Sequence, residues 1–408
     1  MVAPPYAGHL NPLLVIAAHL RTRGAQATFV TGPAKVATCR ALGFEAVPVL
    51  AGDPQAMERI ADTDRVTGHP LRTLRQVRAN LRLLPRVLGD LQAAADLFRP
   101  DAIIADFCAP VAGVVANRLG VPWITTIPTP FAIENRRGTP AYCGGWTPRP
   151  GPLGTLRDAA GRTSTRALKR LTGALFRGEL RAFGGSLYRP DGSEAFYSDQ
   201  AIWALGLEAL EFDRDWPDAV DFIGPITSDP TSRLAPTPPA RRGDRSRVLV
   251  TLGTHLPWAK AGLVDQVSAL AERLPGHDFV VACGDASGGS TGARAGPTVE
   301  VVPWLPYDDA LPAFDAVIHH GGAGITYSTL RAGLPCLVWP HDYDQFDFAA
   351  RIEHHGLGLR IRRLSDAVTG LPRALAAPRT SLEVFAGLVR ASDPLAAAAR
   401  TLDELTAG

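Results

Sequence analysis

A glycine-rich segment in the last third of the chain has the most specific chemical pattern in the sequence. Residues 318–345 are IHHGGAGITYSTLRAGLPCLVWPHDYDQ, an apolar run followed by three glycines and a stretch with helical pattern. Glycines let the backbone approach an oxyanion closely, and the free N–H groups and dipole at a helix start favour a phosphate. His320 is placed beside these glycines as a further hydrogen-bond donor. The segment predicts a phosphate-binding turn, with a tight strand–helix turn without ligand as the alternative.

A histidine and an aspartate far apart in the sequence form the second candidate site. His9 lies in PPYAGHLNPLL at 4–14, which has a single glycine and is a poor dinucleotide fingerprint. Asp106 ends the buried-type run AIIADF at 102–107, and strand ends of this kind lie at the ligand edge of a parallel sheet. A carboxylate beside a histidine fixes its tautomer and stabilises the imidazolium, which makes the histidine a general base. The alternatives are a structural histidine and a helix-capping aspartate.

The elements that must position these residues follow an alternating pattern. Short apolar runs separated by helical stretches indicate βαβ units and a largely parallel sheet. The expected strands before residue 226 lie at 27–32, 45–49, 102–107, 122–127 and 201–206, and those after it lie at 248–254, 278–284, 299–304, 316–322 and 336–340. The expected fold is α/β, with two doubly wound Rossmann-like domains that face a cleft. Only Met1 to Ala3 precede Pro4-Pro5, so the first strand is either unusually short or begins before this sequence.

The boundary between the two expected domains is a stretch without apolar periodicity. Residues 227–247, TSDPTSRLAPTPPARRGDRSR, are rich in Pro, Ser and Arg and predict a linker. The expected units are an N-terminal domain over 1–226, a C-terminal domain over 248–390 and a final helix over 391–408 that packs back on the N-terminal domain.

Composition narrows the class of protein. The chain has 408 residues, 46% of them hydrophobic, which fits a globular protein of more than one domain. With 42 basic and 40 acidic residues the net charge is +2, too small to hold nucleic acid or a membrane surface by itself. Five separated cysteines without a CxxC pair argue against disulfides and structural zinc. The start has no signal-peptide pattern and no run is long enough to span a membrane, so we expect a cytoplasmic protein.

These motifs together resemble the GT-B glycosyltransferases, specifically the inverting family that moves sugars from nucleotide sugars to small lipophilic acceptors. The resemblance covers essentially the whole chain. In chain order the similar segments are PPYAGHLNPLL, ADF, FDRDWPDAVDFIGPI, TLGT, VPWLP and HHGGAGITYSTLRAGLPCLVWPHDYDQ, of which the last is highly specific. The resemblance implies that the N-terminal domain binds the acceptor and the C-terminal domain binds the nucleotide sugar.

The resemblance also implies a role for each matched position. His9 would take the proton of the acceptor hydroxyl, with Asp106 as its partner. Trp304 would stack on the pyrimidine base, and Leu305 would meet the base through its backbone. The remaining donor-binding residues would be His320, Gly321, Gly322, Gly324, Thr254 and Thr326 at the diphosphate and Asp344 and Gln345 at the sugar hydroxyls.

Two positions depart from the family pattern. Ile325 replaces a threonine of the usual GGAGTT, which implies one hydroxyl fewer near the phosphates. Ser328 stands where many members that use uridine donors have a glutamate that grips both ribose hydroxyls, and this change favours a dTDP-sugar over a UDP-sugar. Asp342-Tyr343-Asp344 spells a DxD, which binds a divalent ion in a different glycosyltransferase fold. Here it falls in the sugar-contact loop, so we expect neither a metal nor another cofactor.

The acceptor is less well defined by the sequence. Aromatic residues between 131 and 197 would either line an apolar acceptor pocket or form ordinary core; the candidates are Phe131, Tyr142 and Trp146, with Phe196 and Tyr197. The expected partners are a dTDP- or UDP-sugar and a lipophilic small molecule, with the chain a monomer or homodimer. The expected function is transfer of a sugar, favoured as a deoxysugar, to a hydroxyl of a natural product in antibiotic or other secondary metabolism.

Other functional classes remain open on the sequence. A non-catalytic homologue that binds a nucleotide sugar or assists a partner enzyme is one, although such a protein has no reason to keep His9 and Asp106. Another nucleotide-sugar enzyme of the same fold, such as an epimerase, is a second. A nicotinamide oxidoreductase is disfavoured because neither half opens with GxGxxG.

Overall fold

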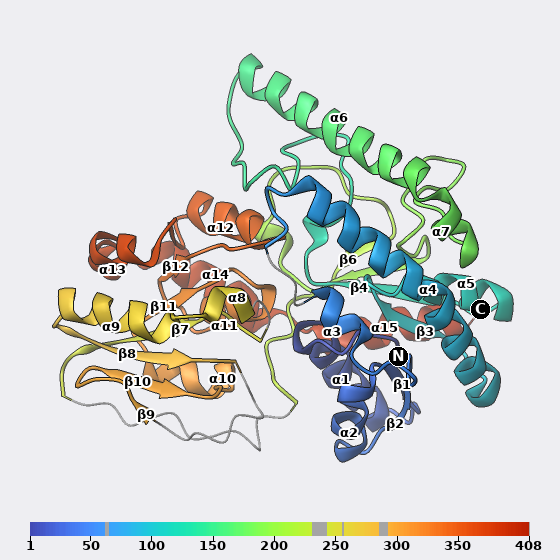
Figure 1. The fold of residues 1–408 in the computed structure, drawn as a ribbon, viewed down its shortest axis with the longest axis horizontal. Helices are drawn as coiled ribbons and strands as arrows, with labels where there is room; N and C mark the ends of the chain where they lie inside the picture. Colours follow the sequence, from blue (N-terminus) through green and yellow to red (C-terminus); the bar gives the residue numbers. More distant parts are fainter. Residues whose placement is uncertain (62–64, 231–242, 255–256, 285–292, 408) are drawn as a thin grey trace.

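The chain forms two α/β domains, each with its own mainly parallel sheet whose strands alternate along the sequence with helices (Figure 1). The computed structural model describes residues 1–61, 65–230, 243–254, 257–284 and 293–407. The prediction of two doubly wound α/β domains is confirmed.

The sheet of the N-terminal domain is parallel and is completed by a single residue of the expected first strand. Val2 forms parallel bridges with both Val30 and Ala105, so it lies between β1 and β3 and joins the two parts of the sheet. The first strand is therefore very short but occupies the central place that the fold requires. The strands are β1 (Thr28–Thr31), β2 (Glu45–Pro48), β3 (Ile103–Asp106), β4 (Trp123–Ile127), β5 (Ala201–Ala204) and β6 (Val220–Phe222).

The sheet of the C-terminal domain has the order β13-β12-β11-β7-β8-β10-β9 and is parallel except for β9 at one edge. Its central strands are continuous runs of buried Val, Leu and Ile, as expected for a sheet covered on both faces. The strands are β7 (Ser246–Thr251), β8 (His277–Ala282), β9 (Ala293–Arg294), β10 (Val299–Val302), β11 (Ala316–His319), β12 (Cys336–Val338) and β13 (Gly358–Arg360).

Helices connect the strands and cover the sheets. The first domain contains α1 (Ala7–Thr22), α2 (Pro33–Ala41), α3 (Ala56–Ala61), α4 (Pro70–Phe98), α5 (Val111–Leu119), α6 (Pro152–Leu175) and α7 (Arg177–Ala182), with 3₁₀ turns η1 (Pro130–Ala132) and η2 (Glu208–Leu210). The second contains α8 (Pro257–Lys260), α9 (Leu263–Arg273), α10 (Tyr307–Ala310), η4 (Leu311–Ala313), α11 (Ala323–Arg331), α12 (Gln345–His354), η5 (Leu364–Asp366), α13 (Ala367–Ala376) and α14 (Thr380–Ala391). None of the helices in the described ranges is long and apolar enough to cross a membrane.

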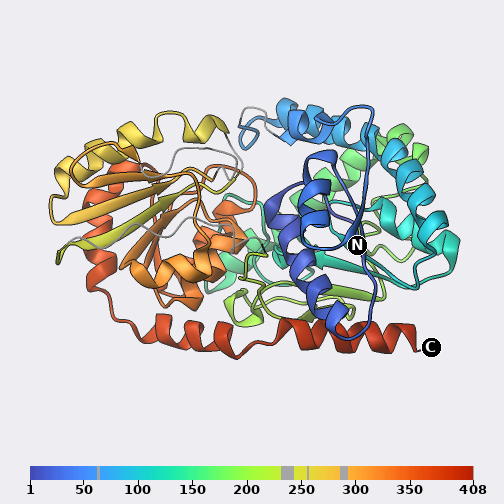
Figure 2. The ribbon, with the colours of Figure 1, turned by 90° about the horizontal axis from the view of Figure 1, so that it is seen from below.

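The chain crosses between the domains twice. The predicted linker 227–247 overlaps the start of β7 at Ser246, and residues 231–242 of it lie outside the described residues. After α14 the chain returns along one side of the molecule to α15 (Pro394–Thr406), which packs against α1 of the N-terminal domain (Figure 2). Arg23 and Asp403 form an ion pair of 2.8 Å at this contact.

The two domains also share a buried core. Phe131 of the N-terminal domain packs edge-on against Phe348 of α12, with ring centroids 5.1 Å apart. Arg351 of α12 forms a buried ion pair of 2.6 Å with Glu211, and both side chains are 2% exposed. Contacts of this kind fix the position of α12 against the N-terminal domain.

Candidate active site

His9 and Asp106 meet at one edge of the N-terminal sheet. Asp106 ends β3, where its N–H donates to the Val2 carbonyl at 2.8 Å, and His9 lies in the first turn of α1. Nδ1 of His9 lies 3.0 Å from both carboxylate oxygens of Asp106. The carboxylate also accepts the Cys108 N–H at 2.9 Å, and the Phe107 ring stacks on the imidazole with centroids 5.6 Å apart. The tautomer and the ring plane of His9 are therefore both fixed.

The electrostatics of this pair suit a proton acceptor. Burial by itself would lower the pKa of His9, but the charge of Asp106 and the hydrogen bonds to Asp106 and Cys108 outweigh it and hold the pKa well above its usual value. The side chain of Asp106 is 1% exposed, whereas that of His9 is 24% exposed and can be reached from solvent. The arrangement can hold a proton on His9 as a stabilised cation.

Asp344 and Asp347 of the C-terminal domain are the next two carboxylates of the candidate site. Asp344 directly precedes α12, and burial raises its pKa to about 7, with the charge of Asp347 adding to the rise and that of His9 opposing it. Because His9 acts on Asp344 across the domain boundary, the two predicted site residues lie within electrostatic reach of each other. Burial likewise raises the pKa of Asp347 to about 6, and its carboxylate accepts the Tyr142 N–H at 3.0 Å.

Asp342 holds the loop before α12 to the N-terminal domain. Its buried carboxylate accepts the N–H of Val66 at 2.8 Å and the N–H of Thr67 at 2.9 Å, and also the Thr67 hydroxyl. Nearby, the Gln76 side chain donates to the Tyr343 hydroxyl at 2.9 Å. Both oxygens of the first aspartate in the DYD sequence are thus used in joining the domains.

The glycine-rich segment forms the predicted turn from strand to helix. Gly321 follows β11 and has φ +93°, a conformation that a residue with a side chain rarely adopts, and its N–H donates to Nδ1 of the buried His319 at 3.1 Å. Gly322 precedes α11, and a Cβ on it would lie 2.5 Å from Nε2 of His320. The backbone and the His320 ring therefore approach each other as only glycine allows.

His320 keeps a buried nitrogen available at this turn. Its Nδ1 has no hydrogen-bond partner within the described part of the chain. Burial, with smaller effects from His319, His341 and Lys260, lowers the pKa of His320 to about 3, so the ring is neutral near pH 7. An unpaired buried polar atom beside a helix start fits a site that an anion would complete.

The other predicted donor-binding residues differ in burial and in hydrogen-bond partners. Thr326 is fully buried, and within the described residues its hydroxyl has no partner. Gln345 uses its side-chain oxygen to accept the N–H groups of His341 at 2.8 Å and Asp342 at 3.1 Å. Elsewhere Gly324 and Thr254 are exposed, Trp304 is half-buried and Leu305 is buried.

Position 325 is part of the hydrophobic core. The Ile325 side chain is 3% exposed and packs in the core of the C-terminal domain, so here it is a packing position. Ser328 is also buried, at 2% exposed.

Two of the three predicted acceptor residues pack against other parts of the protein. Phe131 is 1% exposed at the domain interface, where Arg351 also stacks on its ring at 4.1 Å. Trp146 lies under α6, where Arg157 stacks on it at 4.8 Å, so it supports that helix. Phe131 therefore lies where the alternative of ordinary core placed it, and Trp146 is half-buried beneath α6; a role of either ring at the acceptor stays a prediction. Tyr142 differs, since it is 50% exposed and its backbone contacts Asp347.

Several residues of this region did not stand out in the sequence. Asp347 is part of the acidic run HDYDQFD, and Asp308 follows the VPWLP segment. The unusual number of aspartates near one helix start was the available signal, but it did not indicate which of them face the other domain. Cys108 lies close enough to His9 and Asp106 that one ligand atom from each falls within 4.8 Å of the others. These atom types could hold Zn²⁺, although the same atoms form the dyad.

A separate open hollow of about 810 Å³ lies in the N-terminal domain. It is bounded by α2 and α3 and by the segment before α3, with Pro33, Ala34, Pro54, Gln55, Glu58 and Arg59 on its wall. None of the predicted site residues borders it.

Known proteins share this fold and parts of this sequence. Residues 268–378 match the family described as Erythromycin biosynthesis protein CIII-like, C-terminal domain. The elloramycin glycosyltransferase ElmGT of Streptomyces olivaceus is 29% identical over 413 aligned residues, which cover 98% of this chain and 95% of that protein.

Solved structures agree with these matches. The crystal structure of the kitacinnamycin glycosyltransferase superposes with a TM-score of 0.73 at 22% identity, covering 100% of this chain and 98% of that one. The glycosyltransferase VinC in complex with dTDP superposes with a TM-score of 0.64 at 19% identity, covering 100% and 99%.

The fold and the sequence matches agree with the resemblance seen in the motifs. The chain therefore has the GT-B fold, matches the EryCIII-like family over residues 268–378, and is similar over nearly its whole length to the elloramycin glycosyltransferase ElmGT.

Proposed function

We propose that the protein is an inverting glycosyltransferase that moves a sugar from a nucleoside diphosphate to a hydroxyl of a lipophilic natural product. The observation that carries the proposal is the His9–Asp106 dyad, with Nδ1 of His9 3.0 Å from the carboxylate and Asp344 of the other domain within electrostatic reach. A base on one domain beside a sugar-binding carboxylate on the other is what transfer between two substrates needs.

The proposed reaction is a single displacement. Nδ1 of His9 is bound to Asp106, so Nε2 takes the proton of the acceptor hydroxyl. The acceptor oxygen forms a bond to the anomeric carbon while the bond from that carbon to the diphosphate breaks. The electron pair leaves with the nucleoside diphosphate, and attack from the opposite face inverts the configuration. Asp106 stabilises the imidazolium that forms.

Negative charge on the leaving diphosphate would be stabilised at the glycine turn. The N–H groups at the start of α11 and the neutral His320 ring are donors at this place. Asp344, with a pKa of about 7, exists in both ionisation states near neutral pH and would accept hydrogen bonds from sugar hydroxyls when ionised. The proposed step uses protein groups only, and we propose that it needs no metal.

We further propose a dTDP-sugar, favoured as a deoxysugar, as the donor. Ser328 offers no carboxylate to a ribose 2′-hydroxyl, and its side chain is buried. The related structure of VinC holds dTDP, which supports the same choice of nucleotide. The matching ElmGT is named for elloramycin, and this supports a natural product as acceptor in a biosynthetic pathway. Location of the reaction in the cytoplasm is part of the same proposal.

Binding of dTDP and UDP to the purified protein, measured by calorimetry with and without Mg²⁺, tests the donor. Tighter binding of dTDP that Mg²⁺ does not change is expected. Preference for UDP would contradict the choice of nucleotide and leave the mechanism standing. Failure to bind either nucleotide would contradict the proposed function and favour a non-catalytic homologue.

Replacement of the base tests the mechanism. His9→Ala should reduce sugar transfer to a panel of polyketide and flavonoid acceptors by at least about 100-fold, the scale of general-base catalysis. Because the glycine turn is on the other domain, the variant should bind dTDP as the wild type does. Transfer at the wild-type rate would refute the role of His9.

A further inference from the structure

The thiol of Cys108 lies beside the His9–Asp106 pair and neither gives nor takes a proton in the proposed reaction. Cys108 comes two residues after the end of β3, where Oδ1 of Asp106 accepts its N–H at 2.9 Å. A ring nitrogen of His9, a carboxylate oxygen of Asp106 and the thiol sulfur all lie within 4.8 Å of one another. In the described ranges no other three His, Cys, Asp or Glu side chains form such a group. The fold thus brings a nitrogen, an oxygen and a sulfur atom together at one place.

The sulfur of this group can be reached from solvent, which is unusual for a cysteine. Unpaired cysteines are among the most buried residues of proteins. Here Cys39 and Cys336 are buried as expected, whereas Cys108 is exposed. The side chain of His9 is 24% exposed as well. An ion in solution can therefore reach both the sulfur and the imidazole.

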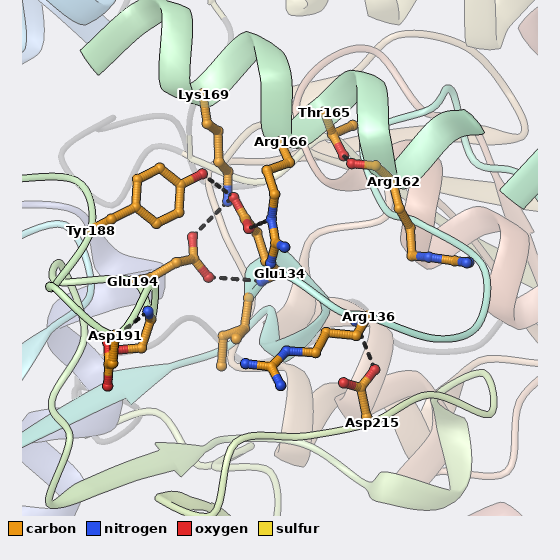
Figure 3. A network of polar contacts seen from close by, with 12 residues as sticks. Glu134, Arg136, Arg162, Thr165, Arg166, Lys169, Tyr188, Asp191, Glu194 and Asp215 are labelled. Atoms are coloured by element: carbon orange, nitrogen blue, oxygen red, sulfur yellow. Dashed lines mark hydrogen bonds and ion pairs between the residues drawn. The ribbon is translucent and has the colours of Figure 1, made fainter. Parts of the chain in front are cut away.

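The carboxylate of the group is not neutralised by a basic side chain. In the network beneath α6, Arg166 donates to Glu134 at 2.7 Å, so a fixed cation of the protein already occupies that carboxylate (Figure 3). Asp106 has no Lys or Arg partner in the described part of the chain, and its bonds go to the His9 ring and the Cys108 N–H. Its negative charge is therefore available to a metal ion.

We propose that His9, Asp106 and Cys108 bind Zn²⁺, and that the bound ion switches sugar transfer off. Zinc takes imidazole nitrogen, carboxylate oxygen and thiolate sulfur as ligands, most often four of them in a tetrahedron. Three protein ligands leave the fourth position to water, so the ion can exchange with solvent.

The geometry needs only a small adjustment to hold the ion. At the usual zinc–ligand distances, a nitrogen and an oxygen on one tetrahedral ion lie about 3.4 Å apart, and a nitrogen and a sulfur about 3.6 Å. Nδ1 of His9 is already 3.0 Å from both carboxylate oxygens of Asp106. The Cys108 sulfur, within 4.8 Å of the other two atoms, has to move by about 1 Å at most, which its exposed side chain allows.

Zinc at this place would prevent His9 from acting as a base, a consequence that rests on the proposed function. A neutral imidazole has one nitrogen with a free lone pair and one that carries a proton. Whichever nitrogen holds the ion, the ring has no lone pair left for the acceptor proton. The Cys108 thiol releases its own proton to solvent when the sulfur binds.

Direct binding measurements test the site without any substrate. The protein, purified without a histidine tag, should bind one equivalent of Zn²⁺ in competition with a chromophoric chelator. Cys108→Ser should raise the dissociation constant at least about 30-fold, as expected for loss of a group that holds the metal. Cys143→Ser is the matched control, because Cys143 is a partly exposed cysteine outside the group, and it should bind zinc as the wild type does. No binding by the wild type, or wild-type affinity in Cys108→Ser, would overturn the proposal.

Substitution of Co²⁺ for Zn²⁺ tests the ligands themselves. The wild type with Co²⁺ should show a thiolate-to-metal charge-transfer band in the near ultraviolet and the strong visible bands of a four-coordinate ion. Cys108→Ser should lose the thiolate band, and His9→Ala should weaken Co²⁺ binding. A wild-type spectrum without the thiolate band, or unchanged binding by His9→Ala, would overturn the assignment of these ligands.

Transfer assays test the switch. Zn²⁺ should inhibit the wild type, and addition of a chelator should restore its rate. For Cys108→Ser, compared with its own rate without zinc, half-inhibition should need at least about 30-fold more Zn²⁺. Activation by zinc, or inhibition of both proteins at the same concentration, would overturn the switch. Absence of transfer without zinc would instead contradict the proposed function, and the binding and cobalt measurements would still decide the site.

Discussion

At the scale of single residues, the surroundings of His9 decide what it can do. The carboxylate of Asp106 holds Nδ1 at 3.0 Å and raises the pKa of the ring, against the effect of burial. A base with a raised pKa is a stronger proton acceptor, but it is protonated over a wider range of pH. Asp106 therefore sets both the strength of the base and the pH at which it is available.

The pH profile of sugar transfer should report this coupling. Because His9 acts in its deprotonated form, kcat/KM should rise with pH through a midpoint above 6.5, the usual pKa of histidine. Asp106→Asn removes the charge that raises the pKa and should move the midpoint down while lowering the maximum rate. A profile with the same midpoint in wild type and variant would show that the titration of His9 does not control kcat/KM.

Trp304 allows a test of nucleotide recognition at a single side chain. If its half-buried ring stacks on the base, Trp304→Ala should weaken dTDP binding by about 1–3 kcal/mol. Trp304→Phe keeps a ring and should restore most of the affinity, which distinguishes stacking from a general loss of structure. An unchanged dissociation constant in Trp304→Ala, measured by calorimetry, would refute stacking.

At the scale of elements, α12 connects the candidate site to the domain interface. Its first turn follows Asp344, and its last turns carry Arg351 into the buried ion pair with Glu211. Arg351 also stacks on Phe131 at 4.1 Å and Phe212 at 4.5 Å. A helix fixed at one end by buried charge and aromatic rings presents its other end at a constant position.

Loss of the Glu211 charge should destabilise this interface. Glu211→Gln leaves the Arg351 guanidinium buried without its counter-charge, which costs about 3–5 kcal/mol for pairs of this kind. Urea denaturation should show the loss, whereas Asp403→Asn, which breaks an exposed ion pair with Arg23, should cost under about 1 kcal/mol. Equal effects of the two substitutions would contradict this account of α12.

At the scale of the whole molecule, the two domains are joined through groups that also belong to the candidate site. Asp342 binds the backbone of Val66 and Thr67, and Asp347 binds the backbone of Tyr142. Burial is the first cause of the raised pKa values of Asp344 and Asp347, and groups of the N-terminal domain also act on them: the charge of His9 lowers the pKa of Asp344 and the Tyr142 N–H lowers that of Asp347. The ionisation of these carboxyls is therefore coupled to groups of both domains.

Stability should consequently depend on the pH between about 4 and 7. The pKa of Asp347 is about 6 in the folded protein and about 3.8 when unfolded, so its favourable contribution is complete below 3.8 and is lost as the pH rises through 6. The shift corresponds to at most about 3 kcal/mol. Asp347→Asn should flatten the fall of the urea midpoint with rising pH. The same slope in wild type and variant would show that Asp347 does not titrate in this way.

Much of the fold could be predicted from the sequence because it depends on local patterns. Continuous apolar runs separated by helical stretches indicated the strands β1 to β5 and most strands of the second sheet. The strands β6, β9 and β13 were missed because each is only two or three residues long, with no apolar run to mark it, and β6 and β13 are only partly buried. Val2 could not be placed from three residues of sequence, since its role depends on the two strands that flank it.

What the sequence determined by itself is the set of chemical groups and their order: a glycine turn beside His320, a histidine at position 9 and an aspartate at a strand end. These follow from backbone conformation and strand direction, which are local. Only the tertiary structure decided which groups meet across the domains, because contacts between distant segments leave no periodic trace. It placed Phe131 in the buried core and Trp146 beneath Arg157 of α6. It also brought the Asp342 carboxylate to the backbone of Val66 at the domain interface and left the leucines of α6 exposed to water.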